Sequence, residues 1–277
     1  MKKIGIIDYY LHEWHADNIP AWINDASGGK MKVCYAWGEI DSPLKEGMTN
    51  EAWASKSGIE LCASQEEVIE KSDYLIVLSP DNAERHEELC KLALTSGKPT
   101  YVDKTFAVGM DDAKRIVQNA KNTPYFTCSA LRYDYELQAI KKENIELVDC
   151  RGPGLFEIYA VHMLEPLYML MGKATRVLAL GDVSAPTLLY DYTGNRRATL
   201  GFFDYNVGFS TAIRYEGGNC ANLKFESEYF RNFASELVKF FETGVPSVSI
   251  EDTLDIMAMF DAGRRATLSP GEWVKIV

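Results

Sequence analysis

The sequence has little of what several classes of protein require. The 29 Lys and Arg residues are outnumbered by 40 Asp and Glu residues, which gives a net charge of −11, and no basic run occurs. A nucleic-acid partner needs a basic face, so this composition argues against one. We find no apolar stretch of about eighteen residues for a membrane span and no export signal. We therefore expect a cytoplasmic protein that binds neither nucleic acid nor membrane.

Paired cysteines are also lacking. The six cysteines are dispersed and form no Cys-x-x-Cys pair, so the spacing indicates neither a zinc site nor a disulfide framework. We expect small, buried thiols in a reduced protein. The rest is ordinary: 277 residues, 47% apolar and 25% charged, suffice for two domains with a buried core.

Strand and helix patterns alternate through the first half of the chain. Short apolar runs indicate buried strands, and Ser64 with Glu67 forms a capping box that starts a helix. This alternation predicts a doubly wound parallel sheet, here a Rossmann-like dinucleotide-binding domain over residues 1–124. The expected strands are 4–7, 31–35, 74–78 and 99–102, and the expected helices are 15–25, 83–96 and 111–122.

The pattern changes in the second half, which is rich in aromatic and β-branched residues separated by Gly and Asn turns. Strands joined by short turns predict an open, mainly antiparallel sheet, and the helix 229–243 has apolar residues at core spacing. We expect an α+β domain over residues 125–277. Its strands are expected at 176–180, 187–192, 197–203 and 209–215.

Polar residues follow two of the predicted parallel strands. Ser79, Pro80 and Asn82 come after strand 74–78, and Asp103 and Lys104 come after strand 99–102. Ligands of open α/β sheets bind beyond the carboxyl ends of the strands, so these residues are expected to converge on one site. The alternative for Lys104 is a solvated lysine at a strand end.

These residues carry a resemblance to a known family. Ser79-Pro80, then His86, then the segment Gly97-Lys98-Pro99-Thr100-Tyr101-Val102-Asp103-Lys104-Thr105 resembles the motifs of the glucose-fructose oxidoreductase and inositol dehydrogenase family, Gfo/Idh/MocA. Asp103 replaces the family's usual Glu, and Thr105 its usual Pro. The order of motifs is similar along the whole chain. The resemblance implies an NAD(P)-dependent oxidoreductase with a catalytic Lys104.

A second landmark lies in residues 154–165, which resemble the family segment Asp-x-x-x-His-x-x-Asp. His162 matches the family's catalytic histidine and Glu165 its following Asp, whereas the preceding Asp position holds Ile158. His162 and Glu165 share a helical face, so Glu165 is expected to orient the imidazole. The alternatives are a core histidine and a surface carboxylate.

Oxidation of a secondary alcohol requires a base for the hydroxyl proton and stabilisation of the developing negative charge. We assign these roles to His162 and Lys104. By the resemblance, the substrate-binding residues are Arg132, Tyr133, Tyr159 and Glu165. An arginine would favour a carboxylate or polyhydroxyl substrate, and a structural ion pair of Arg132 is the equal alternative.

The main departure from the family lies after the first strand. Asp8, Tyr10 and Glu13 stand where relatives have the glycines that let a dinucleotide diphosphate approach the backbone. Asp8 would also repel the diphosphate, so the cofactor is bound in a shifted pose, weakly or not at all. Glu39 favours NAD over NADP. The expected cofactor-binding positions are Ile7, Asp8, Tyr10, Leu11, Glu39, Ser79, Pro80, Asn82, His86 and Asp103.

His12 and His15 have the spacing of a pair of metal ligands on a helix, but no third ligand is evident nearby, and we predict no metal site. We interpret His15 as a packing residue.

The leading hypothesis is an NAD(P)-dependent oxidoreductase acting on a sugar, polyol or related hydroxy compound. The alternatives are a non-redox ligand-binding or regulatory protein that has lost the dinucleotide, and a lyase or hydrolase that uses nicotinamide transiently. Apolar residues of both parities, Leu200, Phe202 and Phe203, predict an exposed apolar sheet face. We therefore expect a homodimer or homotetramer formed through the second domain, which also binds the small-molecule substrate.

Overall fold

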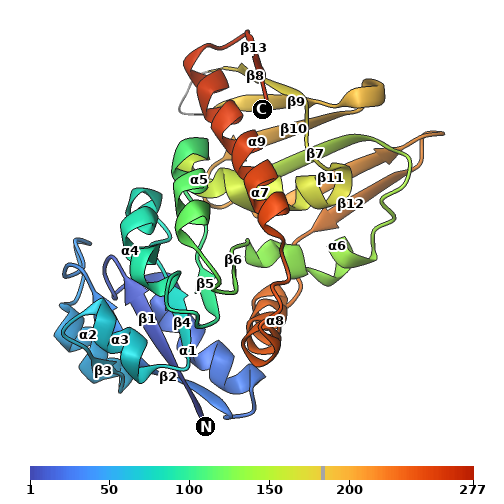
Figure 1. Cartoon of the computed structure of the whole chain (residues 1–277). Coiled ribbons are helices and arrows are strands. Elements are labelled where there is room, and N and C mark those ends of the chain that lie inside the picture. Colours follow the sequence, from blue (N-terminus) through green and yellow to red (C-terminus); the bar gives the residue numbers. More distant parts are fainter. Residues whose placement is uncertain (182–184) are drawn as a thin grey trace. The chain divides into compact units, whose positions relative to one another are not determined.

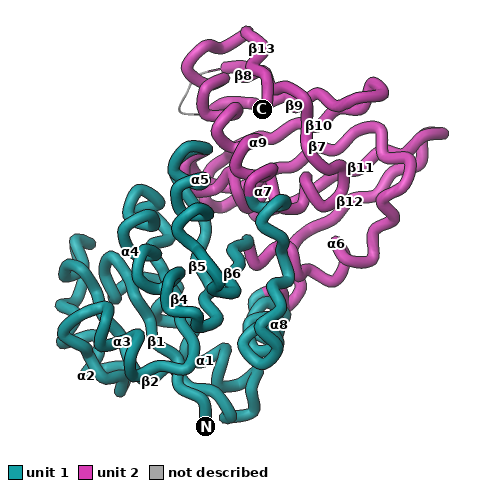
Figure 2. Tube along the Cα trace, in the orientation of Figure 1, with its two compact units in different colours: residues 1–128, 230–253 teal, residues 129–229, 254–277 magenta. Residues whose placement is uncertain are grey.

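A computed structural model describes residues 1–181 and 185–277, which form two compact units (Figure 2). Unit 1 comprises residues 1–128 and 230–253, and unit 2 comprises residues 129–229 and 254–277. The sequence predicted one division, between residues 124 and 125. In the structure the chain returns to unit 1 after residue 229, because Phe233, Phe240 and Phe241 of helix α8 (Tyr229–Thr243) pack against aromatic side chains of the first 128 residues.

Unit 1 is built on a six-stranded parallel sheet with the order β3-β2-β1-β4-β5-β6 (Figure 1). This is the strand order of dinucleotide-binding sheets, and it places a topological switch point between β1 and β4. The predicted Rossmann-like class is confirmed. The strands are β1 Lys2–Asp8, β2 Met31–Gly38, β3 Glu60–Leu61, β4 Tyr74–Val77, β5 Thr100–Val102 and β6 Tyr125–Phe126. The helices are α1 Trp14–Ala26, α2 Asn50–Ser57, α3 Gln65–Lys71, η1 Ala83–Arg85, α4 His86–Ala93 and α5 Met110–Asn119.

Local sequence explains these elements. The residues from Ile4 to Ile7 are buried throughout, as expected for a central parallel strand covered on both faces. Helix α3 begins where the Ser64 hydroxyl accepts the N–H of Glu67, as the capping-box pattern predicted.

Unit 2 contains a mixed seven-stranded sheet with the order β12-β11-β7-β10-β9-β8-β13. Only the β7–β10 pair is parallel among the described pairs, so the sheet is mainly antiparallel, as predicted. The strands are β7 Ile145–Pro153, β8 Arg176–Leu180, β9 Thr187–Asp191, β10 Arg197–Phe203, β11 Ser210–Tyr215, β12 Cys220–Lys224 and β13 Trp273–Lys275. The helices are η2 Ala130–Tyr133, α6 Tyr135–Ala139, α7 Phe156–Met171, η3 Thr193–Asn195 and α9 Ile250–Leu268.

The sheet of unit 2 keeps a clear alternation of faces. On β10, Leu200 and Phe202 are buried, whereas Phe203 is 47% exposed. The face that carries Phe203 also carries ion pairs, including Arg151 with Asp149, and is therefore more polar than the sequence predicted. The predicted oligomer stays a prediction. Within the described residues, no helix is both long and apolar enough to cross a membrane.

Candidate functional site

The carboxyl edge of the unit 1 sheet gathers charged side chains that are shielded from solvent. Asp8 ends β1 and is 1% exposed, and Asp103 and Lys104 follow β5 and are 2% and 5% exposed. Charged groups are seldom buried to this degree unless they are paired, and buried charges with perturbed pKa values cluster at functional sites. The edge at the switch point is therefore the candidate site of unit 1.

Lys104 lies against the segment that follows β4, as the sequence predicted. Its ammonium Nζ donates to the Pro80 carbonyl oxygen at 3.3 Å. The Ser79 hydroxyl donates to the Asn82 carbonyl oxygen at 2.9 Å, which closes the turn, and Ser79 has a φ of 138°. The Asn82 side chain donates to Glu84 at 2.9 Å. Ser79, Pro80 and Lys104 thus meet at one place.

Asp103 connects Lys104 to the first helix. Its Oδ1 accepts the backbone N–H of Lys104 at 2.8 Å, and its Oδ2 contacts Nδ1 of His15 on α1. Burial alone would raise the pKa of Asp103. The charge and hydrogen bond of His15, with the charge of Lys104, outweigh burial and lower that pKa to about 2. Asp103 is therefore a carboxylate at neutral pH.

The turn between β1 and α1 is closed by its own carboxylate. Glu13 caps α1, and its side chain accepts the N–H of His15 at 2.7 Å and the N–H of Ala16. These first-turn N–H groups are the donors that a diphosphate uses at a helix N-terminus. Burial raises the pKa of Glu13 to about 7, although His15 opposes the shift.

Asp8 adds a second carboxylate to this turn. Its Oδ1 accepts the N–H of Tyr9 at 2.6 Å, and its Oδ2 has no hydrogen-bond partner among the described residues. Burial, followed by the charge of Glu13, raises the pKa of Asp8. The donors of α1 are taken and two carboxylates lie beside them, so these residues do not fit the diphosphate of a dinucleotide in its usual position.

Other predicted cofactor positions contribute differently. Ile7 and Leu11 are fully buried core residues, and Tyr10 is 6% exposed. Arg85 donates to both carboxylate oxygens of Glu39, from Nη2 to Oε1 at 2.5 Å and from Nε to Oε2 at 3.2 Å. Arg85 is thus the partner of the Glu39 carboxylate, and the preference for NAD over NADP stays a prediction.

His86 lies behind the lysine segment. It is fully buried, and its Nδ1 lies 2.8 Å from the carbonyl oxygen of Thr105. Burial lowers the pKa of His86, so the ring is neutral and donates from Nδ1 to the oxygen. The geometry gives His86 the task of holding the backbone after Lys104.

In unit 2, His162 lies on α7 beside Ser129, whose hydroxyl oxygen is 2.7 Å from Nδ1 of the imidazole. Glu165 Oε1 accepts the N–H of Ser129 at 3.3 Å, and Oε2 accepts Nε of Arg132 at 2.6 Å. Glu165 is thus linked to His162 through Ser129. Arg132, 8% exposed, forms the buried ion pair that was the alternative to substrate binding, and Tyr133 is half-buried on η2.

Aromatic rings flank His162. The centroids of Tyr159 and Phe209 lie 5.9 and 5.3 Å from the imidazole. Two glycines near the end of β7 make room for these rings. A Cβ on Gly154 would lie 2.3 Å from the Tyr159 ring, and one on Gly152 would lie 2.7 Å from the Phe209 ring. Both glycines therefore shape the surroundings of the histidine.

His12 and His15 do not share a ligand position. His12 Nδ1 accepts the N–H of Met48 at 3.0 Å, whereas His15 binds Asp103. Throughout residues 1–181 and 185–277, no three His, Cys, Asp or Glu side chains are grouped as metal ligands.

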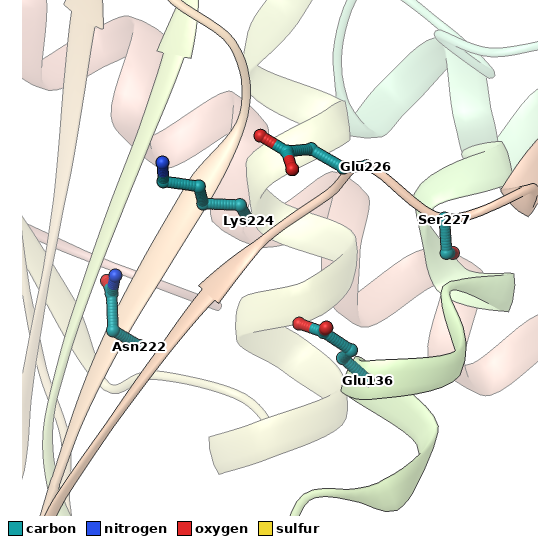
Figure 3. A pocket seen from close by; sticks show the side chains of 5 residues that line it. All are labelled: Glu136, Asn222, Lys224, Glu226 and Ser227. Carbon is teal, nitrogen blue, oxygen red and sulfur yellow. The ribbon is translucent and has the colours of Figure 1, made fainter.

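A surface pocket of about 430 Å³ lies in unit 2, and the sequence singled out none of the residues that line it (Figure 3). Its lining combines one lysine with two carboxylates and two small polar side chains: Glu136, Asn222, Lys224, Glu226 and Ser227. This mixed, open surface does not define a ligand.

Sequence reasoning missed three elements of these sites. The contact of His15 with Asp103 joins residues 88 positions apart, and no local pattern marks it. The hydroxyl of Ser129 was not expected to meet His162. Capping by Glu13 had a usable signal, because an acidic residue directly before a helical pattern is a frequent cap or first-turn residue.

Comparison with known proteins agrees with this architecture. Residues 40–127 match the family described as oxidoreductase family, NAD-binding Rossmann fold (GFO_IDH_MocA). Similar solved structures include a probable dehydrogenase from Thermotoga maritima, with a TM-score of 0.77, 16% identity and 99% of both chains covered. A second is the WlbA dehydrogenase from Bordetella pertussis, solved with NADH and UDP-GlcNAcA, with a TM-score of 0.78, 15% identity and 99% and 98% covered. A third is a putative myo-inositol dehydrogenase from Sinorhizobium meliloti 1021, with a TM-score of 0.76, 14% identity and 100% of both chains covered. No curated protein matches the chain.

The sheet order and the polar strand ends thus define a Rossmann-like fold, and the matching family model is that of NAD-binding oxidoreductases. Residues 40–127 match the model of the Gfo/Idh/MocA family, which confirms the resemblance seen in the sequence, and the solved dehydrogenases share the fold of the whole chain. The matched segment contains Lys104 but begins after the turn that holds Asp8 and Glu13.

Proposed function

We propose that the protein is an NAD(P)-dependent oxidoreductase that acts on a sugar, polyol or related hydroxy compound. The observation that carries the proposal is the buried ammonium of Lys104 at the carboxyl edge of the sheet, within the segment that matches the family. Solved neighbours named as an inositol dehydrogenase and as a dehydrogenase bound to a sugar nucleotide support the substrate class.

The residues of the chain divide the work of proton removal and charge stabilisation. A base that takes the hydroxyl proton contributes about 10²–10⁴-fold, and His162, whose Nδ1 is engaged by Ser129, suits that role. A fixed positive group beside the oxygen stabilises the developing negative charge, for about 10²–10³-fold, and we assign this role to Lys104.

The first turn of α1 disfavours cofactor binding in the usual position. The diphosphate does not fit the first turn of α1, because Glu13 occupies the N–H groups there. A nicotinamide dinucleotide, NAD or NADP, is therefore proposed to bind without those contacts.

Direct binding measurements test this proposal. Calorimetry with NAD and NADP should show binding. With at least one member of a panel of inositols, sugars and sugar nucleotides, the near-ultraviolet absorbance of reduced nicotinamide should appear. No heat with either dinucleotide at about millimolar concentration, well above affinities typical of enzymes, would reject the proposal.

A second candidate function is a non-redox ligand-binding protein, which the occupied helix terminus at Glu13 favours. A bound sugar or polyol, detected by calorimetry without any reduction of nicotinamide, would distinguish it from the enzyme.

We also propose a homodimer or homotetramer formed through the open face of the unit 2 sheet, supported by the exposed rings of Phe203 and Trp273. Light scattering should give a multiple of 31.1 kDa, and Phe203→Glu should shift the mass to the monomer. A monomer mass for the wild type at micromolar concentration would contradict the assembly.

A further inference from the structure

We propose that Glu13 is an internal anion that takes the place of the cofactor's diphosphate at α1, and that it thereby determines how this chain holds its cofactor. The diphosphate then adds nothing to the affinity, which comes from the rest of the dinucleotide. The closed position is a latent anion site, because removal of the internal carboxylates exposes its donors. This inference deepens the proposed function and rests on it.

The turn from β1 to α1 uses its backbone N–H groups internally. Glu13 accepts two of them from the first turn of α1, the N–H of His15 at 2.7 Å and the N–H of Ala16. In the middle of the turn, the N–H of Leu11 donates to Oδ1 of Asn50 at 3.2 Å. A dinucleotide-binding turn offers such groups to the phosphates instead. Side chains of this chain therefore hold donors that a diphosphate needs.

Burial makes the Glu13 carboxylate a strong competitor for this position. Only 6% of the residue is exposed, so solvent screens its charge weakly. Hydrogen bonds from backbone N–H groups to a carboxylate are charge-assisted, and the helix dipole favours a negative group at this end. A diphosphate would have to displace the carboxylate from both bonds and would meet its charge at close range. The exchange of one anion for another therefore yields no net affinity.

Asp8 opposes a diphosphate from the strand side of the turn. It is 1% exposed, and its Oδ1 accepts the N–H of Tyr9 at 2.6 Å. Its buried Oδ2 has no hydrogen-bond partner among the described residues. A buried acceptor without a partner is costly, which points to a ligand group that donates. A hydroxyl is a group of that kind, whereas an ionised phosphate offers only acceptors.

The basic side chains beside the turn are engaged within the chain. Nδ1 of His15 contacts the carboxylate of Asp103, and Nζ of Lys104 donates to the Pro80 carbonyl oxygen at 3.3 Å. Both groups therefore already have partners, and neither makes up for the two carboxylates of the turn. The balance of charge at this position excludes a second anion.

Inorganic pyrophosphate tests the closed position without any cofactor. Titrations at pH about 8.5 keep Glu13 charged, since burial raises its pKa to about 7. In the wild type, the backbone N–H resonances of His15 and Ala16 should not move when pyrophosphate is added. They should shift in Glu13→Ser, in which a hydroxyl still caps the helix. The shift should saturate at about 10-fold lower pyrophosphate in Asp8→Asn/Glu13→Ser, which lacks both carboxylates.

The same spectra decide the result. Their dispersion shows whether each variant is folded, and Glu51→Ser, which removes one charge from the exposed first turn of α2, should behave as the wild type. Movement of the His15 and Ala16 resonances in the wild type would overturn the inference. So would the absence of any shift in both folded variants.

Calorimetry with ADP and adenosine measures what the diphosphate contributes. In the wild type at the same pH, the Kd of ADP should be no lower than that of adenosine. In Asp8→Asn/Glu13→Ser, ADP should bind about 10-fold or more tightly than adenosine, whose Kd should stay within about twofold of the wild type. A wild type that binds ADP about 10-fold more tightly than adenosine contradicts the inference even if no variant folds.

The two proposals fail separately. If NAD is reduced while ADP binds the wild type far more tightly than adenosine, the inference is wrong and the oxidoreductase stands. If neither dinucleotide gives heat, the proposed function fails, and the pyrophosphate titration alone then decides whether Glu13 closes the position.

Discussion

The candidate sites of the two units are built on different physical principles. In unit 1 the groups are charges: Asp8, Glu13, Asp103 and Lys104 are all buried and shift one another's titration or hold one another's backbone. In unit 2 a single histidine lies among aromatic rings, and the nearby charges neutralise each other in the pair Arg132–Glu165. Charge balance therefore governs the first site, and shape governs the second.

The largest expected effect tests the histidine of unit 2. His162→Asn removes the proposed base but keeps a side chain that can bond to the Ser129 hydroxyl. We expect kcat to fall by about 10²–10⁴-fold and the rise of rate with pH to disappear. A pH–rate profile measures both, and a profile like that of the wild type would remove His162 from the mechanism.

Lys104→Ala tests the charge that the unit 1 site contributes. The variant loses the ammonium that contacts the Pro80 carbonyl oxygen, and we expect kcat to fall by about 10²-fold or more. Circular dichroism should show an unchanged fold, because the strand β5 before it is undisturbed. Lys98→Ala is a control on the same segment, and full activity in Lys104→Ala would contradict the assignment.

Glu13→Gln tests whether buried charge governs unit 1. The pKa of Glu13 is raised from 4.5 to about 7, so the folded state holds its proton more tightly than the unfolded chain. The corresponding stability is fully present below pH about 4.5 and is lost as the pH rises through about 7, by about 3 kcal/mol. Glutamine keeps one acceptor oxygen for the helix but has no charge.

Denaturant titrations of this variant at several pH values provide the measurement. Above pH about 8, Glu13→Gln should be more stable than the wild type. Any stability that the variant still loses as the pH rises should reflect Asp8, whose pKa is also raised. Glu51→Gln, at an exposed position in the first turn of α2, should leave the pH dependence unchanged. Equal slopes for Glu13→Gln and the wild type would show that charge does not govern this turn.

Parts of these sites could be predicted because their signals are local. The apolar runs before Ser79 and Asp103 fix two strand ends, and neighbouring parallel strands bring those ends together. The position of His162 on a helix was implied by the resemblance to the family segment, and the structure has it on α7.

The rest depends on long-range packing. Strand β7, an interior strand of the unit 2 sheet, was not predicted because Asp149 and Arg151 point to its open face and hide its apolar alternation. The His15–Asp103 contact depends on how α1 docks on the sheet, and the return of α8 to unit 1 depends on aromatic partners far along the chain. No short window of sequence contains either.

The smallest expected effect on activity comes from a test of shape in unit 2. Gly154 has a φ of +74°, and a Cβ there would lie 2.3 Å from the Tyr159 ring, so Gly154→Ala must both strain the backbone and move the ring. Gly217 has a φ of +82° with nothing near its missing Cβ, and Gly217→Ala therefore carries the backbone strain alone. We expect about 1–2 kcal/mol for Gly217→Ala, and about 1–3 kcal/mol more for Gly154→Ala.

Denaturant unfolding of the two alanine variants isolates the contribution of the ring by difference. Since Tyr159 lies 5.9 Å from His162, its displacement should also shift the His162 ring resonances in Gly154→Ala and leave them in place in Gly217→Ala. Equal destabilisation of both variants, with unchanged His162 resonances, would mean that the Tyr159 ring can move aside with no loss of stability. The contrast between a site governed by charge and a site governed by shape would then rest on unit 1 alone.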